Sequence, residues 1–235
     1  MDTQHMVHDF QGVVVQKPWG YEYQMYSNGT IALWYLHIAA GRRTSLHCHP
    51  RKKTGLIILS GQAEVSFLND AMTLGPLGKI MIRPGLFHAT RAISPEGITL
   101  IEVETPCDKE NLVRLDDEYD RTEKPYEGAD ALRPMDETCV QIPDPVEDRE
   151  QSLVVDDCVL TVRKIADSDA FKQWPLGDLV LVLEHGLYSV SGEPVLGPAD
   201  VVSSDTLRRL AETFSAPYGA SLLSIRHQDE TAPIP

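Results

Sequence analysis

Residues 41–88 read GRRTSLHCHPRKKTGLIILSGQAEVSFLNDAMTLGPLGKIMIRPGLFH, and this stretch decides the fold. His47 and His49 are separated by one residue in a segment expected to form a strand, and His88 follows a Pro-Gly turn. Because alternate residues of a strand point to the same face, the first two imidazoles lie on one side. Together with His88 they can converge on one point, and three converging imidazoles are typical ligands of a metal ion.

Short strand-like segments continue on both sides of this stretch, with turn residues between them. Ser27-Asn28-Gly29 is a strong hairpin signal, and residues 62–68 alternate apolar and polar side chains. Strands are expected at residues 13–26, 31–39, 46–49, 56–59, 62–68, 72–74, 79–82, 88–92 and 98–104. Regularly spaced short strands without a long helical pattern predict an all-β sandwich or barrel.

The chain divides into two halves joined by a segment of different character. Residues 106–150 are acidic and contain prolines, and within them residues 121–150 are expected to be a linker that packs on the surface. Strand signals resume after it. We therefore predict a first domain at residues 13–120 and a second at residues 151–228.

The two halves share a sequence pattern that indicates an internal repeat. Residues 74–78 read LGPLG and residues 196–200 read LGPAD. Leu56 to Leu59 then corresponds to Leu179 to Val182, one strand and one turn upstream. Continued without gaps from the two turns, the register places Leu210 at the position of His88. The repeat hypothesis is that only the first copy kept its histidines. The alternative is that any two strand-turn-strand segments look alike.

The bulk composition excludes several classes of partner. The 235 residues carry a formal net charge of -14, which argues against nucleic acid and anionic membranes as partners. No apolar run approaches the length of about 18 residues that a membrane span needs, and no signal peptide is expected. The four cysteines are scattered without a CxxC pair, which favours a reducing, cytoplasmic location.

The glycines and histidines of the deciding stretch resemble two motifs of the cupin family. Residues 41–49 followed by Gly61 resemble the first motif, G-x5-H-x-H-x3-4-E-x6-G. Residues 78–88 resemble the second, G-x5-P-x-G-x2-H, with one residue fewer between the proline and the histidine. The resemblance covers about residues 13–120. It implies a jelly-roll β-barrel with one divalent metal ion inside.

Two further segments resemble cupins of the mannose-6-phosphate isomerase type. They are KPWGYE at residues 17–22 and LVRLDDEY at residues 112–119. Residues 150–228 resemble a degenerate second cupin. The resemblance therefore implies a bicupin with two cupin-type β-barrels, the second degenerate, and a homodimer.

The chain departs from the cupin pattern at the expected glutamate. Thr54 occupies that position, with Lys53 beside it. His47, His49 and His88 remain as metal ligands, and three imidazoles suit Zn, Fe or Ni, with Mn as a further candidate. The metal identity stays open. Glu102 or Glu104 would supply a carboxylate from a neighbouring strand, and Lys53 would act as a base or bind an anion; we treat all three as candidate catalytic residues.

Basic residues surround the motif in a chain that is otherwise acidic. Of these, Arg51, Arg83 and Arg91 are candidates for binding a phosphate or carboxylate. Tyr21 is a candidate for contact with a sugar ring. The alternative for each arginine is an ordinary solvated turn residue, and for Tyr21 a core or rim aromatic side chain.

These residues lead to competing hypotheses of function. In the first, a metal-dependent isomerase or epimerase moves a proton on a small sugar or sugar phosphate. In the second, the three histidines bind Fe(II) in a dioxygenase, which the missing glutamate favours. A third hypothesis is a sugar-binding cupin without catalysis.

Overall fold

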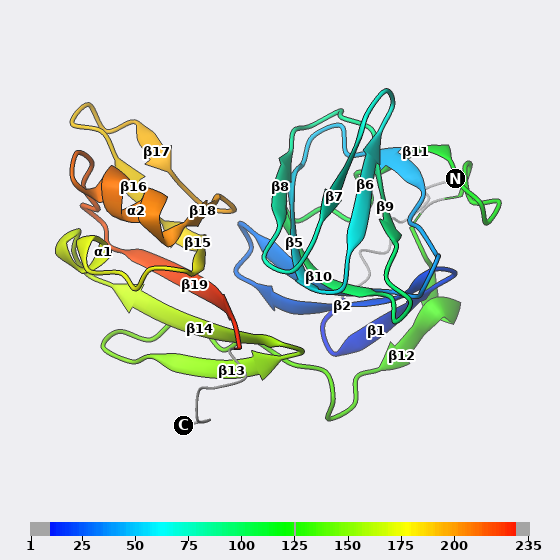
Figure 1. The fold of residues 1–235 in the computed structure, drawn as a ribbon, viewed down its shortest axis with the longest axis horizontal. Coiled ribbons are helices and arrows are strands. Elements are labelled where there is room, and N and C mark those ends of the chain that lie inside the picture. The colour runs from blue at the N-terminus through cyan, green and yellow to red at the C-terminus, as the bar shows by residue number, and fades with distance from the viewer. Residues whose placement is uncertain (1–9, 125, 229–235) are drawn as a thin grey trace, which may run out of the picture.

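Antiparallel strands form most of the protein, and the computed structural model describes residues 10–124 and 126–228 (Figure 1). The first part contains β1 (Val13–Lys17), β2 (Gly20–Ser27), β3 (Ala32–Ile38), β4 (Leu46–Cys48), β5 (Lys53–Ser60), β6 (Ala63–Phe67), β7 (Ala71–Leu74), β8 (Lys79–Ile82), β9 (His88–Ala92), β10 (Ile98–Thr105), β11 (Val113–Asp116), the 3-10 turn η1 (Ala129–Ala131) and β12 (Leu132–Pro134). The second part contains β13 (Gln151–Val155), β14 (Cys158–Ile165), α1 (Asp169–Lys172), β15 (Leu179–His185), β16 (Leu187–Tyr188), β17 (Pro194–Leu196), β18 (Val201–Ser203), α2 (Ser204–Ala211) and β19 (Ala220–His227). No helix among the described residues is long and apolar enough to cross a membrane.

The first half is a jelly roll made of two sheets. One sheet has the order β12-β1-β2-β3-β10-β5-β8, and the other has the order β11-β4-β9-β6-β7. From β3 to β10 the chain passes repeatedly between the sheets, because β3, β5, β8 and β10 lie in one and β4, β6, β7 and β9 in the other. This order defines the double-sheet jelly roll, and the expected all-β architecture is confirmed.

Strand β3 shows how the larger sheet buries both of its faces. Trp34, Leu36 and Ile38 point into the barrel, whereas Leu33 and Tyr35 point to the opposite face and join a second core cluster. A strand covered on both faces has a nearly continuous apolar sequence, which explains the run at residues 32–38. The barrel interior therefore lies on one side of this sheet, and the C-terminal half packs on the other.

The C-terminal half repeats one sheet of the jelly roll. Its larger sheet has the order β13-β14-β19-β15-β18, which matches β2-β3-β10-β5-β8 strand by strand. The connecting turns also match. Leu77 N donates to Ile58 O, and Ala199 N donates to Val182 O at the equivalent place. Both Leu77 and Ala199 have positive φ, at 59° and 68°.

The observed pairing corrects the predicted register of the repeat by one residue. In the first half Leu56 lies opposite Ile80, and in the second half Val180 lies opposite Val202. Counted from the matched turns, Leu56 corresponds to Val180 rather than to Leu179. The predicted match to Leu179 is therefore one residue short, and in a strand a shift of one residue exchanges the two faces.

Two helices stand where the first half has the strands that carry its histidines. Between β14 and β15 lies α1, at the place of β4, and between β18 and β19 lies α2, at the place of β9. Ser203 caps α2 by accepting a hydrogen bond from Thr206 N, and Leu207 is buried beneath it. Leu210, which the repeat aligned with His88, lies in this helix. The described part of the second half is thus a degenerate jelly roll.

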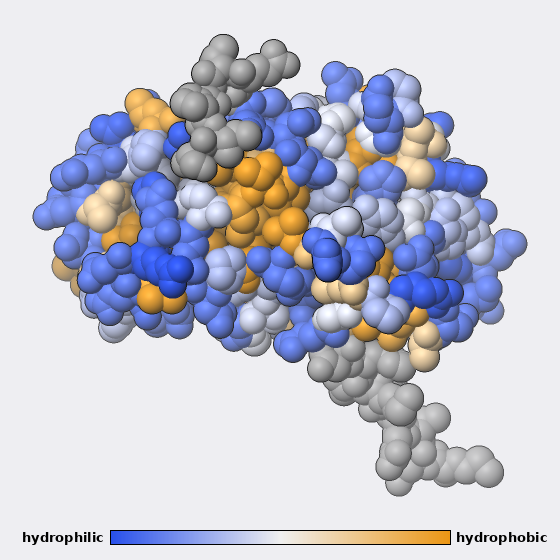
Figure 2. Space-filling view, turned by 90° about the horizontal axis from the view of Figure 1, so that it is seen from below, coloured by the Kyte–Doolittle hydropathy of each residue, from blue (hydrophilic) through white to orange (hydrophobic). Residues whose placement is uncertain are grey.

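The two halves share a core. One cluster joins Leu33 and Ile57 of the barrel to Leu160, Leu181 and Leu223 of the second half. The segment 121–150 packs along the barrel. Its strand β12 pairs with β1, and Ile142 N donates to Met25 O. Seen from below, the surface carries an apolar patch near the centre of the molecule, with polar residues around it (Figure 2).

Candidate metal centre

Two strands of the smaller sheet bring the three histidines together. His47 lies in β4 directly opposite His88 at the start of β9, and His49 follows the end of β4. The ring centroids of His47 and His88 are 4.5 Å apart, and those of His47 and His49 are 4.9 Å apart. One ligand atom from each histidine lies within 4.8 Å of the other two. The sequence prediction that these residues converge is confirmed.

Backbone carbonyls fix the orientation of all three imidazoles. Nδ1 lies 2.8 Å from Ser45 O in His47, 2.7 Å from Asn111 O in His49 and 3.1 Å from Leu86 O in His88. A carbonyl oxygen only accepts hydrogen bonds, so in each neutral ring Nδ1 donates and Nε2 keeps its lone pair. This is the tautomer of a histidine that binds a metal ion through Nε2.

The surroundings favour the neutral form of the rings. Burial lowers the pKa of His88 to about 4 and that of His49 to about 2, and Lys52 adds to both effects by charge repulsion. Burial, followed by the neighbouring histidines, holds the pKa of His47 well below its usual value. The Nε2 atom of His49 is buried without a hydrogen-bond partner. Neutral rings with unpartnered lone pairs fit a divalent metal ion.

The fourth position of the cupin motif offers no carboxylate. The hydroxyl oxygen of Thr54 is buried without a hydrogen-bond partner. Glu104 lies opposite Thr54 in the sheet, but Trp34 Nε1 donates to its Oε1 at 3.0 Å and Lys52 Nζ to its Oε2 at 2.5 Å. Both oxygens of Glu104 are therefore engaged. Within the described residues the group suited to a metal consists of the three histidines alone.

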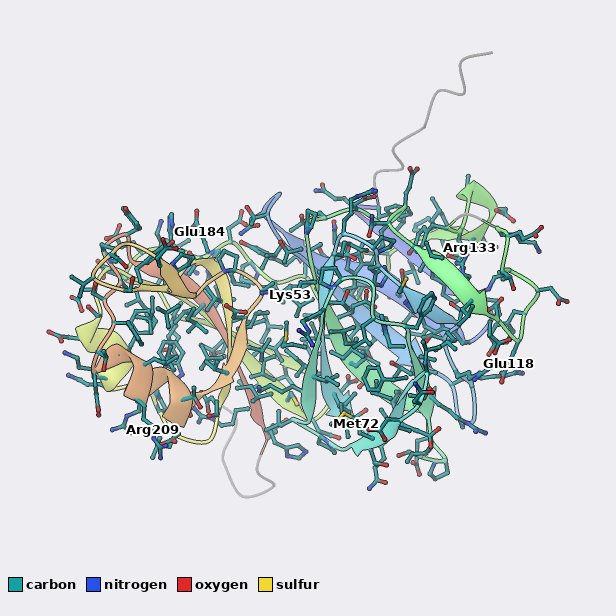
Figure 3. The ribbon with its side chains drawn as sticks, turned by 90° about the horizontal axis from the view of Figure 1, so that it is seen from above. Lys53, Met72, Glu118, Arg133, Glu184 and Arg209 are labelled. Atoms are coloured by element: carbon teal, nitrogen blue, oxygen red, sulfur yellow. The ribbon has the colours of Figure 1, made fainter. Side chains whose placement is uncertain are left out.

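Lys53 does not point toward the histidines, which corrects our expectation for it. Its Nζ lies 2.8 Å from Asp200 Oδ1 of the second half, and the residue sits between the two halves (Figure 3). Lys52 is the lysine inside the barrel, with only 1% of its surface exposed. Adjacent strand residues face opposite sides, and the sequence did not settle which of the two faces inward.

A network of buried charges fills the barrel beside the histidines. Lys109 Nζ lies 3.4 Å from Glu22 and 3.8 Å from Glu104, and 3.7 Å above the Trp34 ring. These carboxylates and burial act on Lys109 in opposite directions, and the carboxylates prevail and raise its pKa. Lys17 lies 3.5 Å from Glu22. Sequence reasoning missed Lys109, because its loop carries no strand or motif signal.

Glu102 lines the same cavity as His47, His49 and Lys52. The cavity measures about 50 Å³. Burial raises the pKa of Glu102, and Lys109 opposes this effect. No salt bridge to Glu102 exists among the described residues, in contrast to Glu104. Of the two expected carboxylates, Glu104 is held in an ion pair and Glu102 remains as a group that can exchange a proton.

The expected substrate-binding residues lie outside the barrel interior. Arg83 and Arg91 are exposed, and Arg51 is exposed with its guanidinium 3.1 Å from Asp108. Tyr21 is on the outer face of the sheet, where its ring stacks on His37, and it lines a separate groove of about 620 Å³. The structure does not bring these four side chains to the histidines. The cations that do line the cavity are Lys17, Lys52, Lys109, Arg114 and Arg121.

Comparisons with known proteins give only distant likenesses. No protein-family model matches the chain, and no curated protein matches it by sequence. Among solved structures, an uncharacterized protein with a double-stranded β-helix domain from Klebsiella pneumoniae is 18% identical, with a TM-score of 0.38, over 41% of this chain and 84% of that one.

Two further solved structures are similar over part of the chain. KdgF from Halomonas sp. is 17% identical, with a TM-score of 0.36, over 43% of this chain and 88% of that one. The DMSP lyase DddQ from Ruegeria pomeroyi is 21% identical, with a TM-score of 0.37, over 40% of this chain and 50% of that one. With such low identities and TM-scores, neither structure assigns a function to this chain. The jelly-roll architecture rests on the strand order described above.

Proposed function

We propose that this protein is a metal-dependent enzyme of cupin type that moves a proton on a small acidic sugar or sugar phosphate, as an isomerase or epimerase. The observation that carries the proposal is one cavity lined by His47 and His49 of the histidine group, by buried lysines and by Glu102. Each group matches one requirement of the reaction, which needs a Lewis acid, an anion site and a proton carrier.

The histidines would hold the metal through their Nε2 atoms. When bound there, a divalent ion would supply Lewis-acid chemistry, which polarises a substrate carbonyl group and makes the neighbouring C–H bond more acidic. The chain itself supplies the rest of the chemistry. Its backbone carbonyls hold the three Nδ1 atoms and so leave the three Nε2 atoms available as ligands.

The buried lysines favour a substrate with a negative charge. Lys52 and Lys109 carry positive charge into the cavity, where charge-assisted hydrogen bonds to carboxylate or phosphate oxygens are strong. The cavity of about 50 Å³ is far smaller than a typical ligand pocket of about 300 Å³ or more. Only the reacting end of a sugar fits inside this conformation, and the remainder extends toward the mouth of the barrel.

Glu102 is the residue we assign to proton transfer. Its raised pKa keeps a proton on the carboxyl group at higher pH than for an exposed glutamate. In an isomerisation the carboxylate accepts the proton from the carbon that bears the hydroxyl group, and the carboxylic acid returns it to the neighbouring carbonyl carbon. The hydroxyl proton moves to the former carbonyl oxygen, so that the carbonyl and the hydroxyl exchange places. In an epimerisation Glu102 takes the proton from one face, and a water molecule supplies a proton to the same carbon on the other face. Both sequences balance without an added oxidant or reductant.

The test is exchange of hydrogen for deuterium in heavy water. Wild-type protein loaded with Zn²⁺, Mn²⁺, Fe²⁺ or Ni²⁺ is incubated with a panel of sugar phosphates and sugar acids, and proton NMR follows the loss of C–H signals. We expect exchange in the wild type, a loss of about 10²-fold or more in Glu102→Gln, and no change in Glu96→Gln, an exposed control. Absence of exchange across the panel, with metal bound, would overturn the isomerase assignment.

The three-histidine ligand set favours a second candidate, an Fe(II) dioxygenase. The carboxylate that Glu104 would contribute is already bound to Trp34 and Lys52, so a bound metal has open positions for substrate and oxygen. Oxygen consumption by the iron-loaded protein with the same panel separates this candidate from the isomerase. Metal and sugar binding without either reaction would support the non-catalytic alternative.

A further inference from the structure

We propose that Asn111 is a positioning residue for the metal centre. Residues 107–112, which we call the strap, connect β10 to β11 and cross the barrel beside the histidines. The strap holds the His49 ring in its metal-binding tautomer through the backbone carbonyl of Asn111, and the Asn111 side chain holds the strap in place. This inference rests on the proposed metal site and adds a residue outside the ligand set to it.

Two hydrogen bonds from one residue carry the inference. The Asn111 carbonyl accepts from His49 Nδ1 at 2.7 Å. Its side-chain Oδ1 accepts from Arg51 N, two residues beyond His49, at 2.9 Å. Asn111 is buried, with 3% of its surface exposed. One buried residue therefore binds both the imidazole and the backbone that follows it, and fixes the ring relative to its own strand.

His49 depends on the strap more than the other two histidines depend on their partners. His47 and His88 each donate to a carbonyl two residues earlier in the same segment, at Ser45 and Leu86. These partners move with the histidines. Asn111 is 62 residues away from His49 in sequence, so the geometry of that bond depends on tertiary packing.

The remaining bonds of the strap make its turn rigid. Asp108 Oδ1 accepts from Glu110 N, and Asp108 O accepts from Asn111 N at 3.2 Å. Lys109 extends into the barrel to Glu22 and Glu104. The carbonyl of Asn111 is thus anchored on one side by the buried lysine and on the other by its own side chain. Removing the side chain loosens the second anchor only.

Asn111→Ala is expected to weaken metal binding and to change the tautomer of His49. Outer-shell partners of histidine ligands typically contribute about 10- to 100-fold to metal affinity, so the Kd for Zn²⁺ should rise by about that factor. In the metal-free protein, the Nδ1–H tautomer should dominate in the wild type, and Nε2–H should gain population in the variant. Asn111→Asp keeps the acceptor oxygen and should restore both properties.

The experiment combines Zn²⁺ titration calorimetry with nitrogen-15 NMR of the imidazole rings in metal-free protein. Asn28→Ala is the matched control, because Asn28 Oδ1 also accepts backbone N–H groups, from Thr30 and Ile31, in a turn between β2 and β3. It should leave Zn²⁺ affinity and the His49 tautomer unchanged. Thermal unfolding of all variants verifies that each is folded.

The outcomes separate this inference from the proposed function. Wild-type Zn²⁺ affinity and an unchanged His49 tautomer in Asn111→Ala would overturn the positioning role. An equal loss of affinity in Asn28→Ala would also overturn it, because the effect would then be general destabilisation. If the wild type binds no metal, the proposed function fails, while the tautomer measurement still tests the contact between Asn111 and His49.

Discussion

The buried histidines make the stability of the metal-free protein depend on pH. The pKa of His88 is lowered from 6.5 to about 4 by burial. Between these values the unfolded chain binds a proton that the folded protein does not, so acidification favours unfolding. The stabilisation is present above about pH 6.5 and is lost as the pH falls toward 4.

We predict that His88→Gln reduces this dependence. Between pH 7 and pH 5 the wild type should lose about 2 kcal/mol more unfolding free energy than the variant, from the linkage of one proton. Urea unfolding at both pH values, with EDTA present to remove metal, measures the difference. Equal losses in the two proteins would show that His88 is not held neutral by the fold.

Lys52 and Lys53 form a matched pair at the start of β5, with Lys52 directed into the barrel and Lys53 toward the second half. Lys52→Met leaves the carboxylate of Glu104 in the interior without its nearest cation, which should cost about 3–5 kcal/mol. Lys53→Met breaks a partly exposed ion pair with Asp200 and should cost less than about 1 kcal/mol. Chemical denaturation of both variants compares the two costs. A larger loss for Lys53→Met would contradict the orientation of the strand.

The same pair shows what the sequence predicts about the site and what it leaves open. The spacing of His47, His49 and His88 predicts their convergence correctly, since strand periodicity and the cupin-like motif spacing place the three side chains. The choice between Lys52 and Lys53 depends on where β5 begins, after a loop without periodicity. Glu104 is engaged because of Lys52, and Asn111 matters because of a contact between distant segments. Neither effect leaves a local signal in the sequence.

One glycine in each half lies directly against the carbonyl of a neighbouring strand. At Gly20 an added Cβ atom would lie 1.9 Å from His37 O, and at Gly186 it would lie 2.0 Å from Leu196 O. Both residues also have positive φ. These carbonyls belong to strand backbone, which cannot move aside without breaking sheet pairing.

We predict that Gly186→Ala destabilises the protein by about 3 kcal/mol or more, as the sum of overpacking and left-handed strain. Gly29→Ala is the control. It has a φ of 82° but no atom within 4 Å of the added Cβ, so only the strain of about 1–2 kcal/mol applies. Thermal unfolding measures both. Equal losses would show that the close approach of the carbonyl has no separate effect.

At the scale of elements, the strands of the first half follow from their sequence, whereas the helices of the second half do not. Residues 207–211 favour a helix or a strand about equally by pattern, and Ser203 decides the outcome as an N-cap. Within residues 126–228, helices replace the strands equivalent to β4 and β9, which explains why no second histidine group occurs in this range. An alignment without gaps cannot show that a strand has become a helix.

The two halves are joined by a shared hydrophobic core in addition to the chain segment between them. Leu223 is fully buried, and it belongs to the cluster that contains Leu33 and Ile57 of the barrel. Sheet-on-sheet packing of this kind buries apolar surface from both partners. Each half therefore depends on the other for one face of its main sheet.

The homodimer and the cytoplasmic location stay predictions.

We predict that the protein unfolds in one cooperative transition and that Leu223→Ala weakens both halves together. Truncation of a buried leucine costs about 2–5 kcal/mol, and the cavity it leaves lies against the barrel sheet.

Trp19 and Trp34 report on the first half and Trp174 on the second, and all three are buried. Single-tryptophan variants therefore follow each half separately by fluorescence during urea unfolding. In the Leu223→Ala background both reporters should shift to lower urea by the same amount. If Trp174 shifts while Trp34 keeps its wild-type midpoint, the halves are independent domains and the shared core does not couple them.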